Sequence, residues 1–228
     1  MQQQQLDDSV FICRYYLKEG PLIRWETYSD INMENPLGRF AWYNKDGSID
    51  SMGNVYMGKK DGTWNYAFKY GKKDIVEEFD KGKFLLRKDP STKTILYANG
   101  NIESMEKPVI KDTTTKEKVF TVIQIPAEYK GGTNNWVKYI SENLKVPERF
   151  MNLHKTDKNY KGVVFVNFII DVKGKVTDIF IEKSCDWSTD SEAIRVLQKS
   201  PKWKPAIQNG AIVKYRLRQA LTFEITED

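Results

Sequence analysis

Strict alternation at the end of the chain constrains the fold more than any other feature of the sequence. Over residues 213–225 the odd-numbered positions are mostly apolar and the even-numbered positions mostly charged or polar. Alternation of this length predicts a β-strand with one face on a core and the other in water. The Asn209-Gly210 dipeptide ahead of it favours a tight turn, and the prolines of the P-K-W-K-P segment at 201–205 prevent a helix from running through. We therefore expect the chain to end in a long strand of a sheet.

A β-hairpin and two helices are predicted upstream of this strand. Gly162 opens a β-branched run to residue 171, the turn is V-K-G-K at 172–175, and a second run returns over 176–183. The first helix is expected to begin at Thr133 or Asn134 and to end before Pro147. The second is expected to begin with a Thr189–Glu192 capping box and to bury an apolar stripe. That stripe is Ala193, Ile194 and Leu197.

Two motifs in these elements resemble the TonB C-terminal domain family. They are G-x-V-x-V-x-F-x-I-D-x-x-G-K-V from Gly162, and W-K-P-A followed by N-G and the last strand. The resemblance covers about residues 120–226, and Pro126 with Gly131-Gly132 resembles the opening segment of the family. A strand is expected at 119–123, before this segment. The resemblance implies an α+β domain with a three-stranded antiparallel sheet and two helices on one face. Trp203 is expected to cover the end of the core between helix and sheet.

The first half of the chain contains an internal repeat of 24 residues. Gly38-x-Phe40-x-Trp42, Gly47 and Gly58 recur as Gly62-x-Trp64-x-Tyr66, Gly71 and Gly82, and Asp50 and Val55 recur as Asp74 and Phe79. Each unit predicts two short strands joined by glycine turns, and such hairpins must stack on their neighbours to bury their aromatic side chains. The expected aromatic core is Trp25, Phe40, Trp42, Trp64, Tyr66 and Phe68.

The G-K-K-D-G-T-W-N-Y segment and its spacing resemble the bacterial variant of the MORN repeat over roughly residues 10–100. The resemblance implies a scaffold or interaction surface. Residues 87–118 then change to a polar, Thr- and Lys-rich composition without periodicity, which predicts a linker with a boundary near Lys111. We therefore expect two domains: an all-β, MORN-like hairpin-repeat array with its linker over 1–110, and a TonB C-terminal-like α+β domain over 111–228.

Composition argues against an enzyme or a metalloprotein. The single histidine, His154, lies in a polar L-H-K-T-D segment that we expect to be an exposed loop, and it excludes a multi-histidine metal site. Asp186, Asp190 and Glu192 cluster at a predicted helix start, where carboxylates serve capping. The two cysteines, Cys13 and Cys185, fall in different predicted domains and are expected to be unpaired thiols. We expect no catalytic residue, no cofactor and no metal.

The last strand is the predicted partner site. An edge strand presents unpaired N–H and C=O groups that accept an extended peptide, and in the TonB family the last strand grips a receptor peptide. The residues expected to contact the partner are Ile212, Val213, Lys214, Tyr215, Arg216, Leu217, Arg218 and Gln219. Arg216 and Arg218 are expected to favour an acidic peptide. By the resemblance, the partner is a protein or peptide, such as an outer-membrane receptor.

Two alternatives to peptide capture remain, a nucleic-acid binder and a structural adaptor. The first 107 residues hold 16 basic and 16 acidic side chains and the rest hold 20 and 15, so the net charge of +5 lies in the second half. A basic strand face with Lys214 could track phosphates, but stacking aromatics would have to share that face and Tyr215 points the other way, so we expect no nucleic-acid partner. The other alternative is a structural adaptor whose strand edge is covered by the repeats or by a second copy, as in a homodimer.

Location follows from the resemblance. The chain has no apolar run long enough to span a membrane and begins M-Q-Q-Q-Q-L-D-D, without signal-peptide character. Either the protein is cytoplasmic, or a signal peptide is missing from this sequence and the protein works in the periplasm or cell envelope of a Gram-negative bacterium. The TonB resemblance favours the envelope, whereas the absence of a membrane anchor and a Pro-rich spacer argues against a complete energy transducer.

Overall fold

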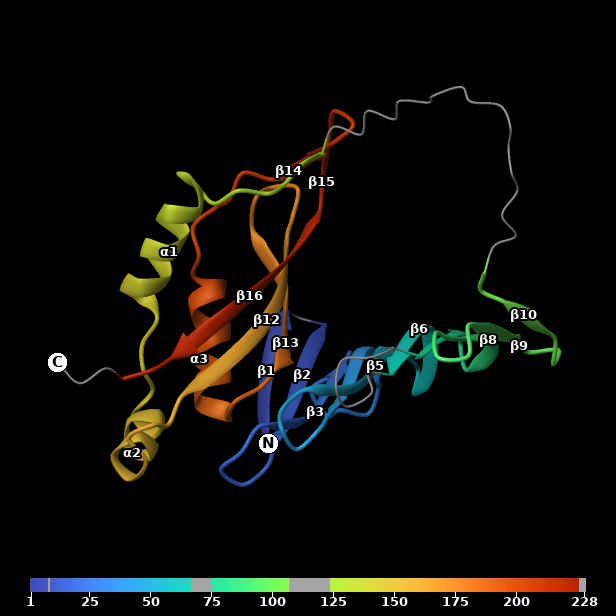
Figure 1. Cartoon of the computed structure of the whole chain (residues 1–228), viewed down its shortest axis with the longest axis horizontal. Coiled ribbons are helices and arrows are strands. Elements are labelled where there is room, and N and C mark those ends of the chain that lie inside the picture. Colours follow the sequence, from blue (N-terminus) through green and yellow to red (C-terminus); the bar gives the residue numbers. More distant parts are fainter. Residues whose placement is uncertain (8, 67–74, 107–123, 226–228) are drawn as a thin grey trace. The chain divides into compact units, whose positions relative to one another are not determined.

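The computed structural model describes residues 1–7, 9–66, 75–106 and 124–225. The chain divides into two compact units, Met1–Thr115 and Lys116–Asp228 (Figure 1). The expected strand at 119–123, the boundary near Lys111, and Phe68, Gly71 and Asp74 of the repeat lie outside the described residues.

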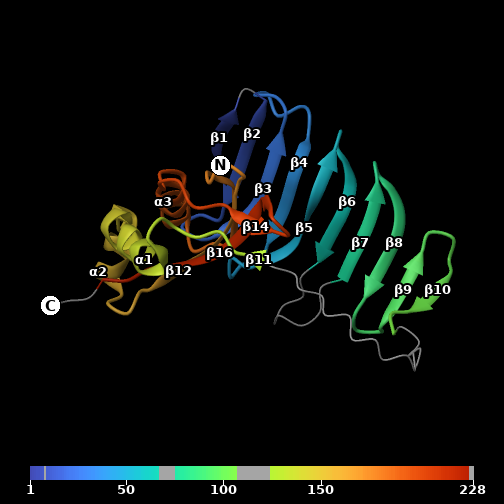
Figure 2. The same cartoon turned by 90° about the horizontal axis from the view of Figure 1, so that it is seen from above.

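The N-terminal unit is all-β. Over its described residues it forms one ten-stranded sheet in which each strand pairs antiparallel with the next along the chain, so that strand order follows sequence order (Figure 2). The strands are β1 (Gln2–Asp7), β2 (Val10–Tyr16), β3 (Leu22–Tyr28), β4 (Leu37–Tyr43), β5 (Ile49–Tyr56), β6 (Lys59–Tyr66), β7 (Ile75–Asp80), β8 (Lys83–Asp89), β9 (Thr94–Tyr97) and β10 (Ile102–Ser104).

Positions that correspond in the 24-residue repeat have corresponding surroundings in this sheet. Phe40 and Trp64 are both buried and belong to one core cluster. Val55 lies in the same cluster, and its counterpart Phe79 packs against it. Trp42, expected in the core, is 37% exposed and packs against Trp64 in a tilted arrangement with ring centroids 5.8 Å apart. Burial of Phe40 and Trp64 in one cluster therefore joins neighbouring hairpins into a continuous sheet.

The C-terminal unit is α+β, as expected. Its central sheet has three antiparallel strands in the order β13-β12-β16, and a second small sheet has the order β11-β14-β15. The strands are β11 (Gln124–Ile125), β12 (Gly162–Ile170), β13 (Val176–Lys183), β14 (Ala206–Gln208), β15 (Ala211–Val213) and β16 (Tyr215–Phe223). The helices are α1 (Gly132–Asn143), α2 (Glu148–Thr156) and α3 (Trp187–Gln198).

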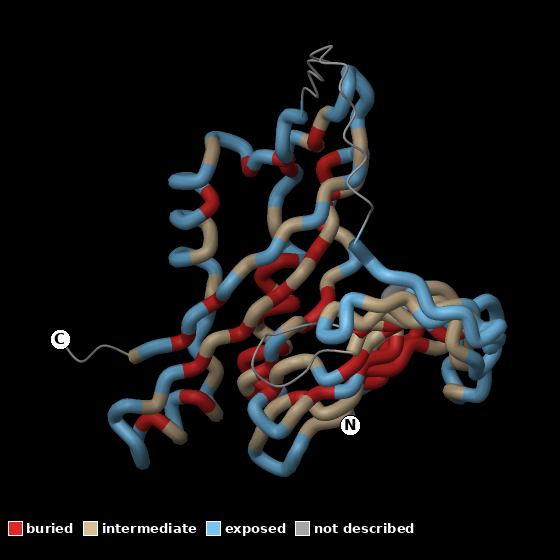
Figure 3. The backbone as a smooth tube through the Cα atoms, turned by 45° about the vertical axis from the view of Figure 1, so that its right-hand side comes forward, coloured by how far each residue is buried: buried red, intermediate tan, exposed pale blue. Residues whose placement is uncertain are grey.

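The core of this unit lies on one face of the central sheet. Buried and half-buried residues alternate along the whole of β12 (Figure 3). The predicted stripe of α3 is buried against this face, and Trp203 is only 8% exposed, so both predictions are confirmed. The α1 residue Tyr139 donates a hydrogen bond from its hydroxyl to the carbonyl of Val196 on α3, at 3.0 Å, and so ties the two helices together.

Helix α2 was not expected. We predicted two helices, but the described residues of this unit form three, and His154 lies buried on α2 rather than in an exposed loop. Phe150 and His154 are four residues apart and therefore share the buried face of this helix. Phe150 is fully buried and contacts Tyr160 and Phe223, with ring centroids 5.0 and 6.0 Å away.

The predicted caps are wrong at both other helices. Gly131, in a left-handed conformation, is the N-cap of α1, in place of Thr133 or Asn134. The capping box of α3 is formed by Asp186 and Thr189, three residues before the predicted one. Asp186 is the better cap because its carboxylate accepts hydrogen bonds from the amides of both Ser188 and Thr189.

Candidate functional site

Strand β16 lies at an edge of the central sheet. Within the described residues it pairs with β12 alone, through nine consecutive partners from Gly162–Phe223 to Ile170–Tyr215 without a register shift. The backbone of this strand is therefore regular, and the side that faces away from β12 has no strand beside it in the described structure.

The opposite edge of the sheet is irregular. The pairing of β13 with β12 shifts register twice, and Asp178 within β13 has a φ of +47°. Bulges and twisted backbone are features that protect an edge strand from pairing with another chain. The two edges therefore differ, and only β16 has the regular backbone that an added strand requires.

The predicted contact residues do not form a single strand. Tyr215 to Gln219 lie on β16, but Ile212 and Val213 lie on β15, which pairs with β14. Lys214 lies between the two strands. The expected strand over 213–225 is thus broken at Lys214 and ends at Phe223, because its first residues turn away to form the small sheet.

The two faces of β16 follow the predicted alternation. Leu221 and Phe223 are buried, whereas Arg216, Arg218 and Ala220 are exposed. An added strand would have the same alternation, with every second side chain on the core face and the others beside the arginines.

The arginines of the outer face already have acidic partners. Arg218 binds Glu182 of β13 with two nitrogens, Nε at 2.8 Å from Oε2 and Nη2 at 2.9 Å from Oε1, and its guanidinium lies 4.2 Å from the ring centre of Phe165. Arg216 Nη2 lies 3.9 Å from Asp178 Oδ2. The charge that was expected to attract an acidic peptide is therefore largely compensated within the sheet.

Pairing of Arg218 with Glu182 shifts the pKa of both groups. Burial alone would raise the pKa of Glu182, but hydrogen bonds from Arg218 and Asn167 outweigh burial and hold the pKa below its ordinary value. The hydrogen bonds to Glu182 raise the pKa of Arg218. This pair remains charged at neutral pH and fixes the outer face of β16.

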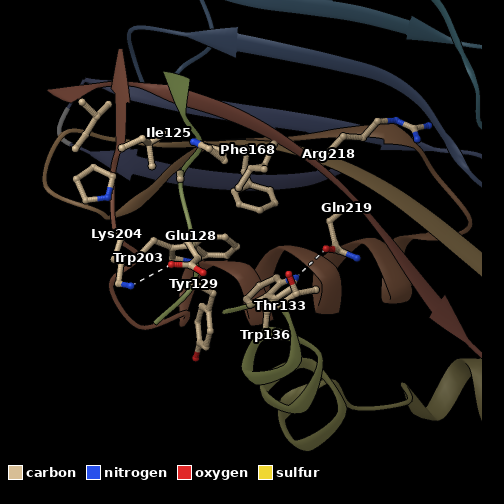
Figure 4. A pocket seen from close by; sticks show the side chains of 15 residues that line it. Ile125, Glu128, Tyr129, Thr133, Trp136, Phe168, Trp203, Lys204, Arg218 and Gln219 are labelled. Carbon is tan, nitrogen blue, oxygen red and sulfur yellow. Dashed lines mark hydrogen bonds and ion pairs between the residues drawn. The ribbon is translucent and has the colours of Figure 1, made fainter. Parts of the chain in front are cut away.

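A pocket opens on the other face, beside the core-facing side of β16 (Figure 4). It has a volume of about 610 Å³ and lies between β16, the start of α1, β11 and the segment from Trp203 to Ile207. We call it the edge pocket; its lining residues are 125–129, 133, 136, 168, 203–205, 207 and 217–219. Three consecutive β16 residues, Leu217, Arg218 and Gln219, form one wall.

Aromatic rings form the floor of the edge pocket. The rings of Trp136 and Trp203 have centroids 4.8 Å apart, and Tyr129 contacts both, at 5.2 and 5.3 Å. Phe168 of β12 packs edge-on to Trp203, at 5.9 Å. The indole Nε1 of Trp136 donates a 2.8 Å hydrogen bond to Oε1 of Gln219, which ties α1 to the edge strand (Figure 4).

Sequence reasoning did not find the edge pocket. It identified Trp203 as a core residue and the β16 side chains as contacts, but not Ile125, Thr133 or Trp136 as their neighbours. The pocket walls come from segments far apart in the chain, and no local spacing relates them. The signal that was present is the excess of aromatics in two polar segments, at Tyr129 to Trp136 and at Trp203.

The polar clusters of the unit have structural roles. Ser184 donates a hydrogen bond from Oγ to Oδ2 of Asp190 at 2.6 Å, and Asp186 caps α3. Burial raises the pKa of the Cys185 thiol, which disfavours the reactive thiolate. Cys13 and Cys185 are free thiols. In the parts of the chain that the structure describes, no group of three or more His, Cys, Asp or Glu side chains could hold a metal ion.

Comparison with known families gives one match. The family model of the Gram-negative bacterial TonB protein C-terminal matches residues 156–225, from the end of α2 to just beyond β16. The matched segment is thus TonB C-terminal-like, whereas α1 and β11, two walls of the edge pocket, lie outside it. No curated protein matches the chain, and no solved structure matches it. No helix among the described residues is long and apolar enough to cross a membrane.

Proposed function

We propose that this protein is a non-enzymatic cell-envelope adaptor whose C-terminal domain captures an extended segment of a partner protein by adding it to β16. The observation that carries the proposal is the unbroken nine-residue register of β16 with β12, which leaves a regular open edge, whereas the opposite edge at β13 is irregular. In this binding mode main-chain hydrogen bonds supply affinity, and side-chain pockets supply specificity.

The family match adds the biological setting to this proposal. A TonB-like domain implies a transport-associated role in the periplasm or cell envelope of a Gram-negative bacterium, with an outer-membrane receptor as the partner. Membrane anchoring and energy transduction form no part of the proposal, since neither follows from this chain. An adaptor function requires only that the open edge of β16 bind a segment of the partner.

For the N-terminal unit, we propose a MORN-like repeat array that acts as an interaction surface. In its support, the repeat partners Phe40 and Trp64 are buried in one cluster, and the repeat glycines Gly38 and Gly62 both have positive φ. Each further hairpin lengthens such a sheet, and the resulting surface can contact a partner along many strands.

The test of strand capture is a proline on β16. We expect a displayed library of extended ten-residue peptides to yield ligands for the full chain, and Arg216→Pro to abolish their binding because proline removes an amide donor and interrupts the ladder. Arg216→Ala, the matched control, should lower affinity only a few-fold, since the main chain is unchanged and this rim charge is already compensated. Both variants are checked for folding by circular dichroism.

A second measurement protects the test against misfolding of the proline variant. Selected peptides are resynthesised with N-methyl groups at alternate residues, first in one phase and then in the other. One phase should lose binding by more than about tenfold, because half of the amides of an added strand point at its neighbour. Equal binding of both N-methylated phases and of the unmodified peptide would exclude strand addition, whatever the proline variant does.

A further inference from the structure

The edge pocket and the open side of β16 are continuous. Leu217, Arg218 and Gln219 form a wall of the pocket and are central to the strand that would receive a partner. A strand laid against β16 places every second side chain on the core-facing side of the sheet, where the pocket opens. Whatever is captured at this edge therefore presents a side chain to the pocket.

The interior of the pocket is apolar and its indole donors are already used. Trp136 donates its Nε1–H to Gln219, and Trp203 donates its Nε1–H to Oγ of Ser200 at 2.9 Å. Ile125, at the rim, remains 51% exposed although it is a large aliphatic side chain. Together with the aromatic floor, Ile125 gives the pocket a largely apolar lining, which is the character of a site for an apolar group.

The charges around the pocket are compensated, which limits the chemistry of the occupant. Lys204 Nζ lies 3.0 Å from Oε2 of Glu128 at the pocket, whereas the guanidinium of Arg218 lies on the opposite face, against Glu182. An acidic side chain would have to displace Glu128 from Lys204, and a basic one would meet the charge of Lys204. A neutral apolar side chain loses neither interaction and covers the aromatic floor.

The pocket is large enough for a large side chain together with part of the segment that carries it. Its volume of about 610 Å³ lies within the range of sites that bind small organic groups. Walls from β16, α1, β11 and the Trp203 segment line it on several sides, so a group that enters loses part of its contact with water.

On the assumption that β16 captures a strand, we propose that the edge pocket selects the captured segment by binding a large apolar side chain, aromatic or aliphatic. Recognition then has two parts: the β16 main chain binds any extended segment, and the pocket selects those with a large apolar residue on the core-facing side. The partner is thus an extended, uncharged-to-mixed peptide with an apolar anchor, rather than an acidic peptide.

The test is a peptide library displayed against the full chain and against two tryptophan variants. Thr133 lines the pocket from the first turn of α1, and the next residue, Asn134, is equally exposed but does not line it. We expect ligands of the wild type to be enriched in Phe, Trp, Leu or Ile at one position of the strand. Thr133→Trp should place an indole in the pocket and weaken these ligands about 10- to 100-fold, the value of burying one large apolar side chain. Asn134→Trp should change their affinity less than twofold.

A double substitution decides whether the anchor and the pocket are in contact. Replacing the enriched residue of the best ligand by Ala should cost the wild type about as much as Thr133→Trp does, and should cost the Thr133→Trp protein almost nothing. Ligands without an apolar preference that still require the β16 main chain would overturn the pocket inference and leave strand capture intact. Absence of any captured peptide would overturn both.

Discussion

At the scale of single residues, Trp203 is fixed by its backbone as well as by its ring. Its amide donates a 2.8 Å hydrogen bond to the carbonyl of Gly174, in the turn between β12 and β13. Gly174 has a φ of +78°, and a Cβ at this position would lie 2.1 Å from the carbonyl oxygen of Trp203. The hairpin turn and the pocket-lining tryptophan are held together by a contact that only glycine permits.

This contact predicts that Gly174→Ala is strongly destabilising. Gly210 is the matched control, because its φ is +81° but a Cβ there would meet nothing within 4 Å. Gly210→Ala should cost about 1–2 kcal/mol of unfolding free energy, the strain of a left-handed residue. Gly174→Ala should cost more, because a backbone oxygen cannot move aside. Urea unfolding measures both, and equal losses would show that the Trp203 contact is not a constraint.

Because Glu182 is paired with Arg218, we expect it to stabilise the fold at neutral pH and to lose this contribution in acid. A carboxylate whose pKa is lowered on folding stabilises the protein above its unfolded pKa, here near the ordinary value of 4.5, and this contribution disappears as the pH falls through the lower folded value. Wild type should therefore exceed Glu182→Gln in melting temperature at pH 7, and the difference should shrink below about pH 4. Glu142→Gln, at an exposed position of α1, serves as the control. A difference that is constant from pH 7 to pH 3 would contradict this assignment.

Local patterns predicted residues well where the side chain acts alone and poorly where partners compete. Trp203 and the stripe of α3 were correctly placed, because large apolar groups are buried almost anywhere they can be. The cap of α3 was misplaced, since Asp186-x-x-Thr189 and Thr189-x-x-Glu192 are both acceptable boxes. Glu192 instead accepts hydrogen bonds from Arg195 and from the amide of Lys145, a partner 47 residues away. No local rule predicts that choice.

Among the elements, period-two alternation predicted β16, and β-branched runs on either side of a turn predicted β12 and β13, whereas α2 was missed. The α2 sequence E-R-F-M-N-L-H-K-T is mostly polar, and a nine-residue helix is marginal without tertiary contacts. It forms because Phe150 is buried, and this burial carries His154 inward with it. A polar residue on a buried face removed the periodic signal that would have predicted the helix.

Replacing the buried His154 of α2 by an apolar residue is expected to stabilise the protein. It is 6% exposed, and neither ring nitrogen has a hydrogen-bond partner among the described residues. Leaving a buried polar group unpaired costs about 1–3 kcal/mol, so His154→Leu should raise the free energy of unfolding by about that amount. Lys155→Leu, at an exposed position of the same helix, should have little effect. Chemical denaturation compares the two, and a destabilised His154→Leu protein would indicate that the imidazole is bound through water.

At the scale of the whole molecule, the two units differ in architecture and in charge. The N-terminal unit is a meander of local pairings and carries no net charge, whereas the C-terminal unit has an α+β core and the basic excess. Their elements were predictable separately because the contacts that specify each sheet lie within one unit. The edge pocket was not predictable, since it requires the tertiary arrangement of residues from Ile125 to Gln219.

We predict that the C-terminal unit folds independently of the N-terminal unit. A fragment of residues 112–228 contains the aromatic floor, all three helices and both small sheets, so each described hydrophobic contact of that unit is retained. We expect it to unfold cooperatively in urea, with a midpoint close to that of the same unit in the full chain, and to bind the selected peptides with unchanged affinity. Far-ultraviolet circular dichroism and tryptophan fluorescence, which reports Trp136 and Trp203, follow the transition. An unfolded fragment beside a folded full chain would mean that the N-terminal sheet completes the core, and that the binding edge cannot be treated as the property of a single domain.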